Sequence, residues 1–181
     1  MTTANKITLV RMAMIPVFIY FALLGGAQND IIALVLFIVA SATDFLDGYV
    51  ARKYNQITDF GKFVDPLADK LLVTAALLVF IERALFPAWM VFVILAREFI
   101  ITSLRNVAAA KGRVLAATWT GKVKTVVQIA SIVVIFVYAI VGSLPAIVPL
   151  VCAWIATLVT LYAGCDYLAK NWDLVRDGAV K

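Results

Sequence analysis

Six apolar stretches, each close to 20 residues long, constrain the fold of this chain more than any other feature. They cover residues 7–24, 30–51, 63–82, 87–110, 122–142 and 146–169. Glycine, proline and polar residues separate them, as at Gly25-Gly26 and Gly142. A helix of this length crosses the hydrocarbon core of a bilayer and satisfies its own backbone hydrogen bonds. The sequence therefore predicts an all-α, polytopic membrane protein with six transmembrane helices in a single domain, residues 1–181.

The amino-acid composition excludes an ordinary soluble domain. Hydrophobic residues make up 64% of the chain and charged residues 15%, whereas about a quarter of the residues of a soluble domain are charged. The first 16 residues lack the small-residue cleavage site of a signal peptide. We therefore expect the first apolar stretch to be retained as a transmembrane helix.

Basic residues are distributed unevenly around the six stretches. The connections near residues 25–30, 82–87 and 142–146 contain only one of the 16 lysines and arginines, Arg83. Because cytoplasmic loops are rich in lysine and arginine, both termini are predicted to be cytoplasmic, in a multi-pass protein of the cell (inner) membrane. The net charge of +5 follows from this rule and from attraction to anionic membrane lipids. Because the membrane explains this positive charge, we expect no nucleic-acid partner.

Four aspartates interrupt the second and third stretches near their predicted cytoplasmic ends. Asp44 and Asp47 are three residues apart, and Asp65 and Asp69 are four apart, so each pair lies on one face of a helix. Asp44 precedes Arg52 by eight residues, which places it about 12 Å inward from the predicted membrane surface. The two pairs thus reach matching depths on adjacent antiparallel helices, and we expect the four carboxylates to converge.

Carboxylates brought together in this way would repel one another or take up protons unless cations neutralised them. The chain has no histidine and only two isolated cysteines, so a metal site must use carboxylates, which favour Mg²⁺ or Mn²⁺. Two divalent cations would balance the four charges. The alternative is that these residues cap helices, as we expect for Asp59 and consider for Asp65 before Pro66. Because acids within a membrane are costly, the functional interpretation is favoured for the set of four.

The region from Asp44 to Asp69 also carries a spaced motif, D-x2-D-G-x2-A-R-x8-G-x3-D-x3-D. Its fixed positions are Asp44, Asp47, Gly48, Ala51, Arg52, Gly61, Asp65 and Asp69. This pattern resembles the signature of the CDP-alcohol phosphotransferase family, and every fixed position is matched. The resemblance implies an enzyme that displaces CMP from a CDP-linked substrate with an alcohol, uses two Mg²⁺ or Mn²⁺ ions and forms a homodimer.

The same resemblance assigns roles to individual residues. Asp44, Asp47 and Asp65 would be the principal metal ligands, and Asp69 would contact the second ion or accept the proton of the attacking hydroxyl. The CDP-binding surface would include Gly48, Arg52 and Gly61, since a guanidinium makes bidentate contacts with phosphate oxygens. The N-terminal segment NKITLVR also looks like a family element that lines the nucleotide pocket, through Asn5, Thr8 and Arg11. For these last three, a capped helix start with an interfacial arginine is the alternative.

A second group of charges lies in the fourth and fifth stretches, and we expect it to select the acceptor alcohol. Candidate ligands of an acceptor phosphate are Arg97, Arg105, Arg113, Lys122 and Lys124. Cations near one membrane face suit an anionic acceptor such as glycerol 3-phosphate or inositol phosphate, whereas cationic choline fits badly. Arg97 could instead pair with Glu98 or a neighbouring helix.

The segments REFIITSLR and GKVKTVVQ resemble those of bacterial phosphatidylglycerophosphate synthases, a group within this family. That resemblance implies CDP-diacylglycerol as donor and glycerol 3-phosphate as acceptor. A phosphatidylinositol-phosphate synthase or another CDP-alcohol phosphotransferase is the alternative within the class. From another class, a divalent-cation or proton-coupled transporter is disfavoured, because the outward half of the chain is nearly devoid of charge.

Overall fold

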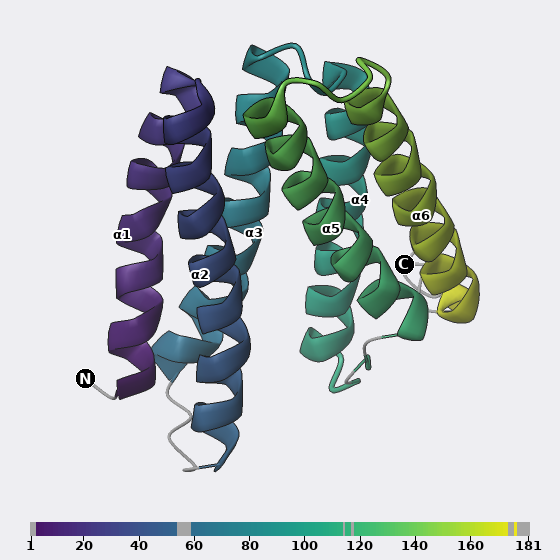
Figure 1. Cartoon of the computed structure of the whole chain (residues 1–181). Coiled ribbons are helices and arrows are strands. Elements are labelled where there is room, and N and C mark those ends of the chain that lie inside the picture. The colour runs from purple at the N-terminus through teal and green to yellow at the C-terminus, as the bar shows by residue number, and fades with distance from the viewer. Residues whose placement is uncertain (1–2, 54–58, 114, 117, 174–175, 177–181) are drawn as a thin grey trace. The chain divides into compact units, whose positions relative to one another are not determined.

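All six predicted helices are present in the computed structural model of the chain (Figure 1). They are α1 (Thr3–Leu24), α2 (Ala27–Lys53), α3 (Asp59–Glu82), α4 (Ala88–Ala110), α5 (Trp119–Val141) and α6 (Val148–Lys170). The structure describes residues 3–53, 59–113, 115–116, 118–173 and 176, with the side chains of residues 3–7, 44–53, 59–66 and 69 excepted. The all-α prediction is confirmed for this part of the chain.

The breaks between helices have the expected chemistry. Gly25 and Gly26 join α1 to α2 with φ angles of 65° and 85°, a left-handed conformation that residues with a Cβ rarely adopt. Pro87 is the N-cap residue of α4, and Pro149 lies in the first turn of α6, where its missing N–H costs least. The break that the sequence predicted at Gly25-Gly26 is thus confirmed. Helix α5 begins at Trp119, three residues earlier than its apolar stretch.

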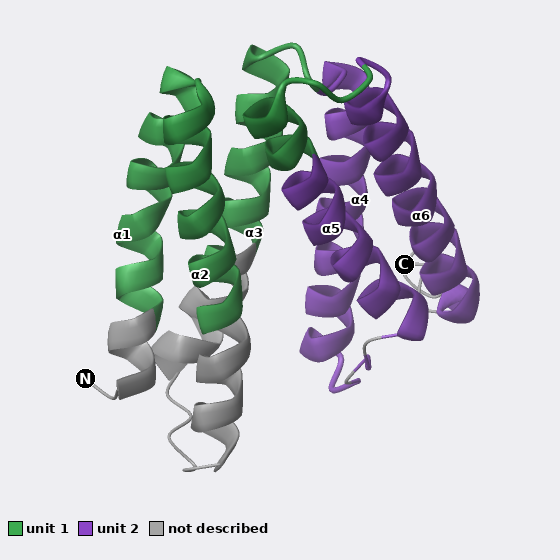
Figure 2. Cartoon of the chain, viewed as in Figure 1, with its two compact units in different colours: residues 1–85, 135–145 green, residues 86–134, 146–181 purple. Residues whose placement is uncertain are grey.

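The chain divides into two compact units (Figure 2). Unit 1 comprises residues 1–85 and 135–145, and unit 2 comprises residues 86–134 and 146–181. Unit 1 therefore contains α1, α2, α3 and the last turns of α5, while unit 2 contains α4, α6 and most of α5. Whether the chain behaves as a single domain stays a prediction.

Four phenylalanines form the centre of unit 1. The ring of Phe18 lies 6.0 Å from that of Phe37 and 5.9 Å from that of Phe136, and Phe80 lies 5.0 Å from Phe136. All four side chains are fully buried. Tilted and edge-to-face rings at these separations attract one another beyond the effect of buried area alone. This cluster holds α1, α2, α3 and the end of α5 together.

One end of unit 1 is closed by an arginine. Arg83, just beyond α3, donates hydrogen bonds to the carboxylate of Asp30 at the start of α2 and to the carbonyl oxygen of Ala22 near the end of α1. The end of α1, the start of α2 and the end of α3 therefore meet. Within unit 1, α2 runs antiparallel to both α1 and α3, as the alternating topology predicted.

In unit 2, α4 and α6 run parallel. Trp89 packs edge-to-face on Trp154 at 5.6 Å, and Arg97 and Arg105 lie against later positions of α6, Gly164 and Tyr167. The contacts advance in the same direction along both helices. Parallel directions of α4 and α6 are what a chain of six transmembrane helices with both termini on one side would require.

Helix α6 has its small residues inside and its large apolar residues outside. Ala153, Ala156 and Ala163 are buried, while Leu158 and Tyr162 are exposed. A helix of a soluble protein has the opposite arrangement, whereas small residues at the interface allow helices to approach closely in a membrane. Among the described residues, α5 and α6 are long and apolar enough to cross a bilayer. Spanning by α1 to α4 stays a prediction.

Candidate active site

The four aspartates fall within helices of unit 1, as the motif predicted. Asp44 and Asp47 lie within the bounds of α2, and Asp65 and Asp69 within those of α3. Their side chains lie outside the described part of the chain, as do those of Asn5 and Arg52 and the surroundings of Gly48 and Gly61. Among the side chains that are described, no cluster of three metal-ligating residues occurs. Convergence of the carboxylates therefore stays a prediction.

Thr8 and Arg11 of the predicted nucleotide pocket are both described, and both are buried in unit 1. The two residues are three positions apart on α1, and each is 1% exposed. An arginine that only anchored the helix at the membrane surface would keep its guanidinium in contact with water. The burial of Arg11 therefore disfavours the interfacial alternative, while its role in binding a nucleotide stays a prediction.

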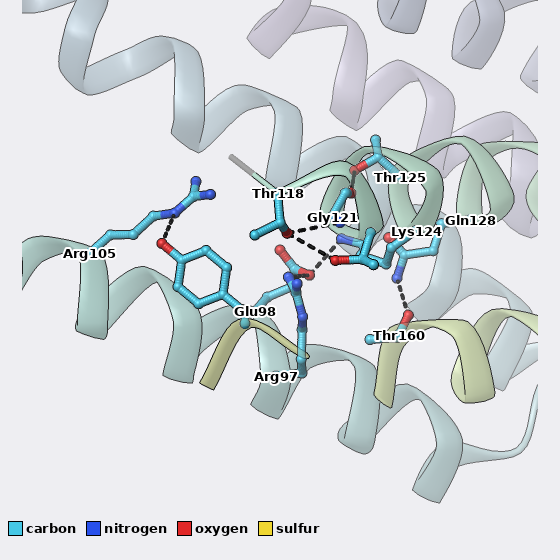
Figure 3. A network of polar contacts seen from close by, with 11 residues as sticks. Arg97, Glu98, Arg105, Thr118, Gly121, Lys124, Thr125, Gln128 and Thr160 are labelled. Carbon is cyan, nitrogen blue, oxygen red and sulfur yellow. Dashed lines mark hydrogen bonds and ion pairs between the residues drawn. The ribbon is translucent and has the colours of Figure 1, made fainter. Parts of the chain in front are cut away.

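The acceptor candidates Arg97 and Lys124 meet at a shared carboxylate in unit 2 (Figure 3). Glu98 Oε1 accepts hydrogen bonds from Arg97 Nη1 at 3.0 Å and from Lys124 Nζ at 2.5 Å. We call Arg97, Glu98 and Lys124 the Glu98 cluster. It joins α4 to α5, and the Lys124 side chain is only 7% exposed. The pairing of Arg97 with Glu98 is the alternative that the sequence left open.

The Glu98 cluster carries two cations and one anion. Burying charges is costly unless they are paired, so Glu98 explains how Arg97 and Lys124 can lie inside the bundle. Among the described residues, the buried Nε of Arg97 has no hydrogen-bond partner. Gly164 of α6 makes room for Arg97, because a Cβ there would lie 2.9 Å from Arg97 Cγ.

Arg105 is held by an aromatic residue instead of a carboxylate. Its Nε donates a hydrogen bond to the hydroxyl oxygen of Tyr167 at 3.0 Å, and its Cζ lies 5.2 Å from the centre of the Tyr167 ring. Tyr167 is buried, whereas Arg105 is exposed. In Figure 3 the two terminal nitrogens of Arg105 lie beyond that hydrogen bond, turned away from it. They can bind an anion.

The remaining two acceptor candidates lie at the surface of unit 2. Arg113 forms an ion pair with Asp173 at 3.0 Å, and both side chains are more than half exposed. An exposed ion pair of this kind contributes little to stability. Lys122 is exposed, and its ammonium group makes no hydrogen bond or ion pair with the described residues. The structure thus brings Arg97 and Lys124 together and leaves Arg105, Arg113 and Lys122 with separate surroundings.

Comparison with known proteins places the chain in a family. The sequence profile of the CDP-alcohol phosphatidyltransferases matches residues 1–162. The chain belongs to this family. Members of the CDP-alcohol phosphatidyltransferase family typically use divalent cations. Membership and the two apolar helices indicate a membrane-bound transferase acting on a CDP-linked substrate.

Individual members of the family are similar to this chain over most of their length. A CDP-diacylglycerol–glycerol-3-phosphate 3-phosphatidyltransferase of Bacillus subtilis is 43% identical, covering 95% of this chain and 96% of the relative. A probable phosphatidylglycerophosphate synthase of Mycobacterium tuberculosis is 39% identical, over 92% of this chain and 80% of the relative. A Rickettsia bellii protein with the same name as the Bacillus one is 36% identical, over 90% and 91%.

Sequence reasoning missed several residues that position the charged groups of this phosphatidyltransferase. Asp166 of α6 accepts hydrogen bonds from Thr120 Oγ1 at 2.7 Å and from Lys170 Nζ at 2.9 Å. Thr120 lies in the first turn of α5, so this contact fixes the part of α5 that carries Lys122 and Lys124. The i, i+4 spacing of Asp166 and Lys170 was the available signal. Nothing in the sequence singled out Tyr167, because a tyrosine near the end of an apolar stretch is typical of a membrane interface.

Proposed function

We propose that this chain transfers the phosphatidyl group of CDP-diacylglycerol to glycerol 3-phosphate, giving phosphatidylglycerophosphate and CMP. The observation that carries the proposal is the 43% identity to the Bacillus subtilis enzyme named for this reaction, across 95% of this chain. Near-complete coverage matters, because it includes both the aspartate motif and the cationic residues of α4 and α5. The family match also sets aside the transporter alternative.

In the proposed reaction, the primary hydroxyl oxygen of glycerol 3-phosphate attacks the β-phosphorus of CDP-diacylglycerol. A new P–O bond forms, and the bond from the β-phosphorus to the bridging oxygen breaks. CMP leaves with that bonding electron pair, and the carboxylate of Asp69 accepts the hydroxyl proton. A base that takes this proton during attack makes the oxygen a stronger nucleophile.

The aspartates of α2 and α3 are suited to bind two divalent cations, Mg²⁺ or Mn²⁺. The donor set is purely carboxylate, on helices whose bounds the structure gives, and such ligands are the ones these ions prefer. We assign Asp44, Asp47 and Asp65 as ligands, with Asp69 on the second ion. When bound, the ions would neutralise the pyrophosphate and stabilise the attacking and leaving oxygens. Arg52, Gly48 and Gly61, with Asn5, Thr8 and Arg11, would hold the nucleotide.

The cations of unit 2 would bind the phosphate of the acceptor. Arg105 presents two terminal nitrogens, the Glu98 cluster holds Arg97 and Lys124 together, and Lys122 is exposed on the first turn of α5. Charge-assisted hydrogen bonds of this kind are about twice as strong as neutral ones. They discriminate an anionic alcohol from a neutral or cationic one. Arg113, already paired with Asp173, would contribute least.

We further propose that all six helices span the cytoplasmic membrane, with both termini and the active site on the cytoplasmic side. The orientation rests on the excess of lysine and arginine at the opposite ends of the helices. Arg83, the single basic residue on the other side, is paired with Asp30. A homodimer is proposed from the family resemblance.

The decisive assay supplies the purified protein with CDP-diacylglycerol, Mg²⁺ and either glycerol 3-phosphate or inositol phosphate, and measures CMP. Release with glycerol 3-phosphate alone is expected. Release with inositol phosphate alone would favour the phosphatidylinositol-phosphate synthase alternative, and release with neither would contradict the proposed function.

A further inference from the structure

Tyr167 is a buried residue of unit 2 whose hydroxyl contacts Arg105, a residue that we propose binds the acceptor phosphate. It is 1% exposed and lies on the inner face of α6, after the small buried residues Ala163 and Gly164. A tyrosine hydroxyl buried in an apolar bundle needs a hydrogen-bond partner. Its partner is the Nε–H of Arg105, at 3.0 Å.

This contact restricts Arg105 in two ways. The hydrogen bond occupies Nε, and the attraction between the guanidinium and the ring, with Cζ at 5.2 Å from its centre, favours one orientation of the plane. An arginine has five donors in a rigid fork, and fixing Nε leaves the two terminal nitrogens to make paired contacts with a phosphate. Free rotation of a long side chain would otherwise oppose binding.

The position of Arg105 suits an anion that arrives from the membrane surface. It precedes the end of α4 at Ala110 by five residues, which is about 7.5 Å along the helix axis. Its side chain is exposed, while the tyrosine that holds it is buried. Tyr167 thus lies inside the helix bundle, while the guanidinium of Arg105 remains accessible to an anion.

We propose that Tyr167 is a positioning residue, which fixes the guanidinium of Arg105 so that its terminal nitrogens meet the phosphate of the acceptor. The inference rests on the proposed function in one respect, that Arg105 binds the acceptor phosphate. Tyr167 itself does not touch the substrate.

The test uses Tyr167→Phe in the full-length protein, because phenylalanine keeps the ring and removes only the hydroxyl. We expect the KM for glycerol 3-phosphate to rise about tenfold, as for the loss of one hydrogen bond to a charged group. The KM for CDP-diacylglycerol and kcat should stay within about twofold, since the contact acts on binding of the acceptor alone. Tyr162→Phe is the matched control, because Tyr162 is on the same helix but is 68% exposed.

A double-mutant cycle separates positioning from helix packing. Arg105→Lys removes the Nε donor, so adding Tyr167→Phe to it should change the KM for glycerol 3-phosphate by less than about twofold more. Additive effects would show that Tyr167 does not act through Arg105. A lower unfolding temperature of Tyr167→Phe with both KM values unchanged would mean that the contact only packs α4 on α6. Either result overturns the inference.

A binding measurement keeps this inference distinct from the proposed reaction. The rise in unfolding temperature on adding inorganic phosphate, without any CDP-lipid, reports anion binding alone. We expect a smaller rise for Tyr167→Phe than for the wild type and Tyr162→Phe. If the wild type released no CMP with glycerol 3-phosphate, the proposed function would fail, while a smaller phosphate effect in Tyr167→Phe would still support the positioning role. Equal phosphate effects in all three proteins would refute it.

Discussion

Arg83 and Asp30 form a two-point ion pair that ties the end of α3 to the start of α2. Arg83 Nη1 and Nη2 lie 2.5 and 2.9 Å from the two carboxylate oxygens of Asp30, and the aspartate side chain is 1% exposed. Charges removed from water in this way depend on each other, because a buried ion that loses its partner keeps the cost of its desolvation. The pair therefore constrains unit 1 at the end that carries the α1–α2 turn.

We expect Asp30→Asn to reduce the free energy of unfolding by about 3 kcal/mol, because it leaves Arg83 without a counter-charge. The double variant Asp30→Asn, Arg83→Met should recover most of that loss, since neither charge then remains in the bundle. Thermal unfolding in detergent measures both changes. A double variant no more stable than the single one would show that the pair does not act as a unit.

Glu98→Gln should change both the stability of the protein and its response to ligand. The substitution removes the negative charge that lies between the positive charges of Arg97 and Lys124. We expect a loss of about 3 kcal/mol of unfolding free energy, in line with the breaking of a buried ion pair. Glycerol 3-phosphate should raise the unfolding temperature more in this variant than in the wild type, since its phosphate supplies the missing negative charge.

The exposed acid at the end of α3 provides the control for Glu98. Glu82→Gln removes the same charge from a side chain in contact with solvent. It should leave both the unfolding temperature and the ligand effect close to the wild-type values. Equal stabilisation of Glu98→Gln and wild type by glycerol 3-phosphate would exclude the Glu98 cluster from the acceptor site.

The sequence predicted the helices of this chain well, because the length and apolarity of each stretch are local properties. It predicted that Arg97 would bind either an acceptor or Glu98, and the structure shows the ion pair with Glu98. That Lys124 shares the same carboxylate depends on how α5 packs against α4, which no local pattern reveals. Tyr167 was missed for the same reason, since its partner lies 62 residues earlier in the chain.

For the aspartate motif, the sequence is more informative than the structure. The spacing of the motif and its resemblance to a family signature predict which residues bind metal and nucleotide. The predicted helical location of the four aspartates agrees with the bounds of α2 and α3. The positions of the carboxyl groups lie outside the described residues, so the metal-binding role depends on the chemistry of the residues and on the family.

Gly164→Ala tests the close approach of α6 to Arg97. The added Cβ would lie 2.9 Å from Arg97 Cγ, so the arginine or the helix has to shift. We expect a loss of about 1–3 kcal/mol of unfolding free energy from this overpacking. Cys165→Ala, at the next and exposed position, should cost far less. Comparable unfolding temperatures for Gly164→Ala and wild type would show that the contact is easily relieved.

Asp69→Asn should abolish turnover while leaving the protein folded. Asparagine keeps the size of the side chain but cannot accept the hydroxyl proton, and a positioned base contributes about 10²–10⁴-fold to rate. Asp59→Asn, a change to the acid we expect to cap α3, should retain activity. CMP release should also stop when a chelator removes divalent cations, and Mg²⁺ or Mn²⁺ should restore it in the wild type only. Substantial turnover by Asp69→Asn would contradict its role as base.

Lys122→Ala should weaken binding of the acceptor, glycerol 3-phosphate, more than binding of the donor, CDP-diacylglycerol. Lys122 is exposed on the first turn of α5, the turn that the hydrogen bond from Thr120 to Asp166 anchors to α6. Loss of one charge-assisted hydrogen bond to the acceptor phosphate should raise the KM for glycerol 3-phosphate about tenfold. The KM for CDP-diacylglycerol should change by less than about twofold, because its pyrophosphate is assigned to the aspartates and Arg52.

Lys111→Ala, which removes an exposed lysine just past α4, is the control for Lys122→Ala and should affect neither constant. If Lys122→Ala raised both constants equally, the lysine would act through general attraction of anions to the membrane surface, and the acceptor assignment would be wrong.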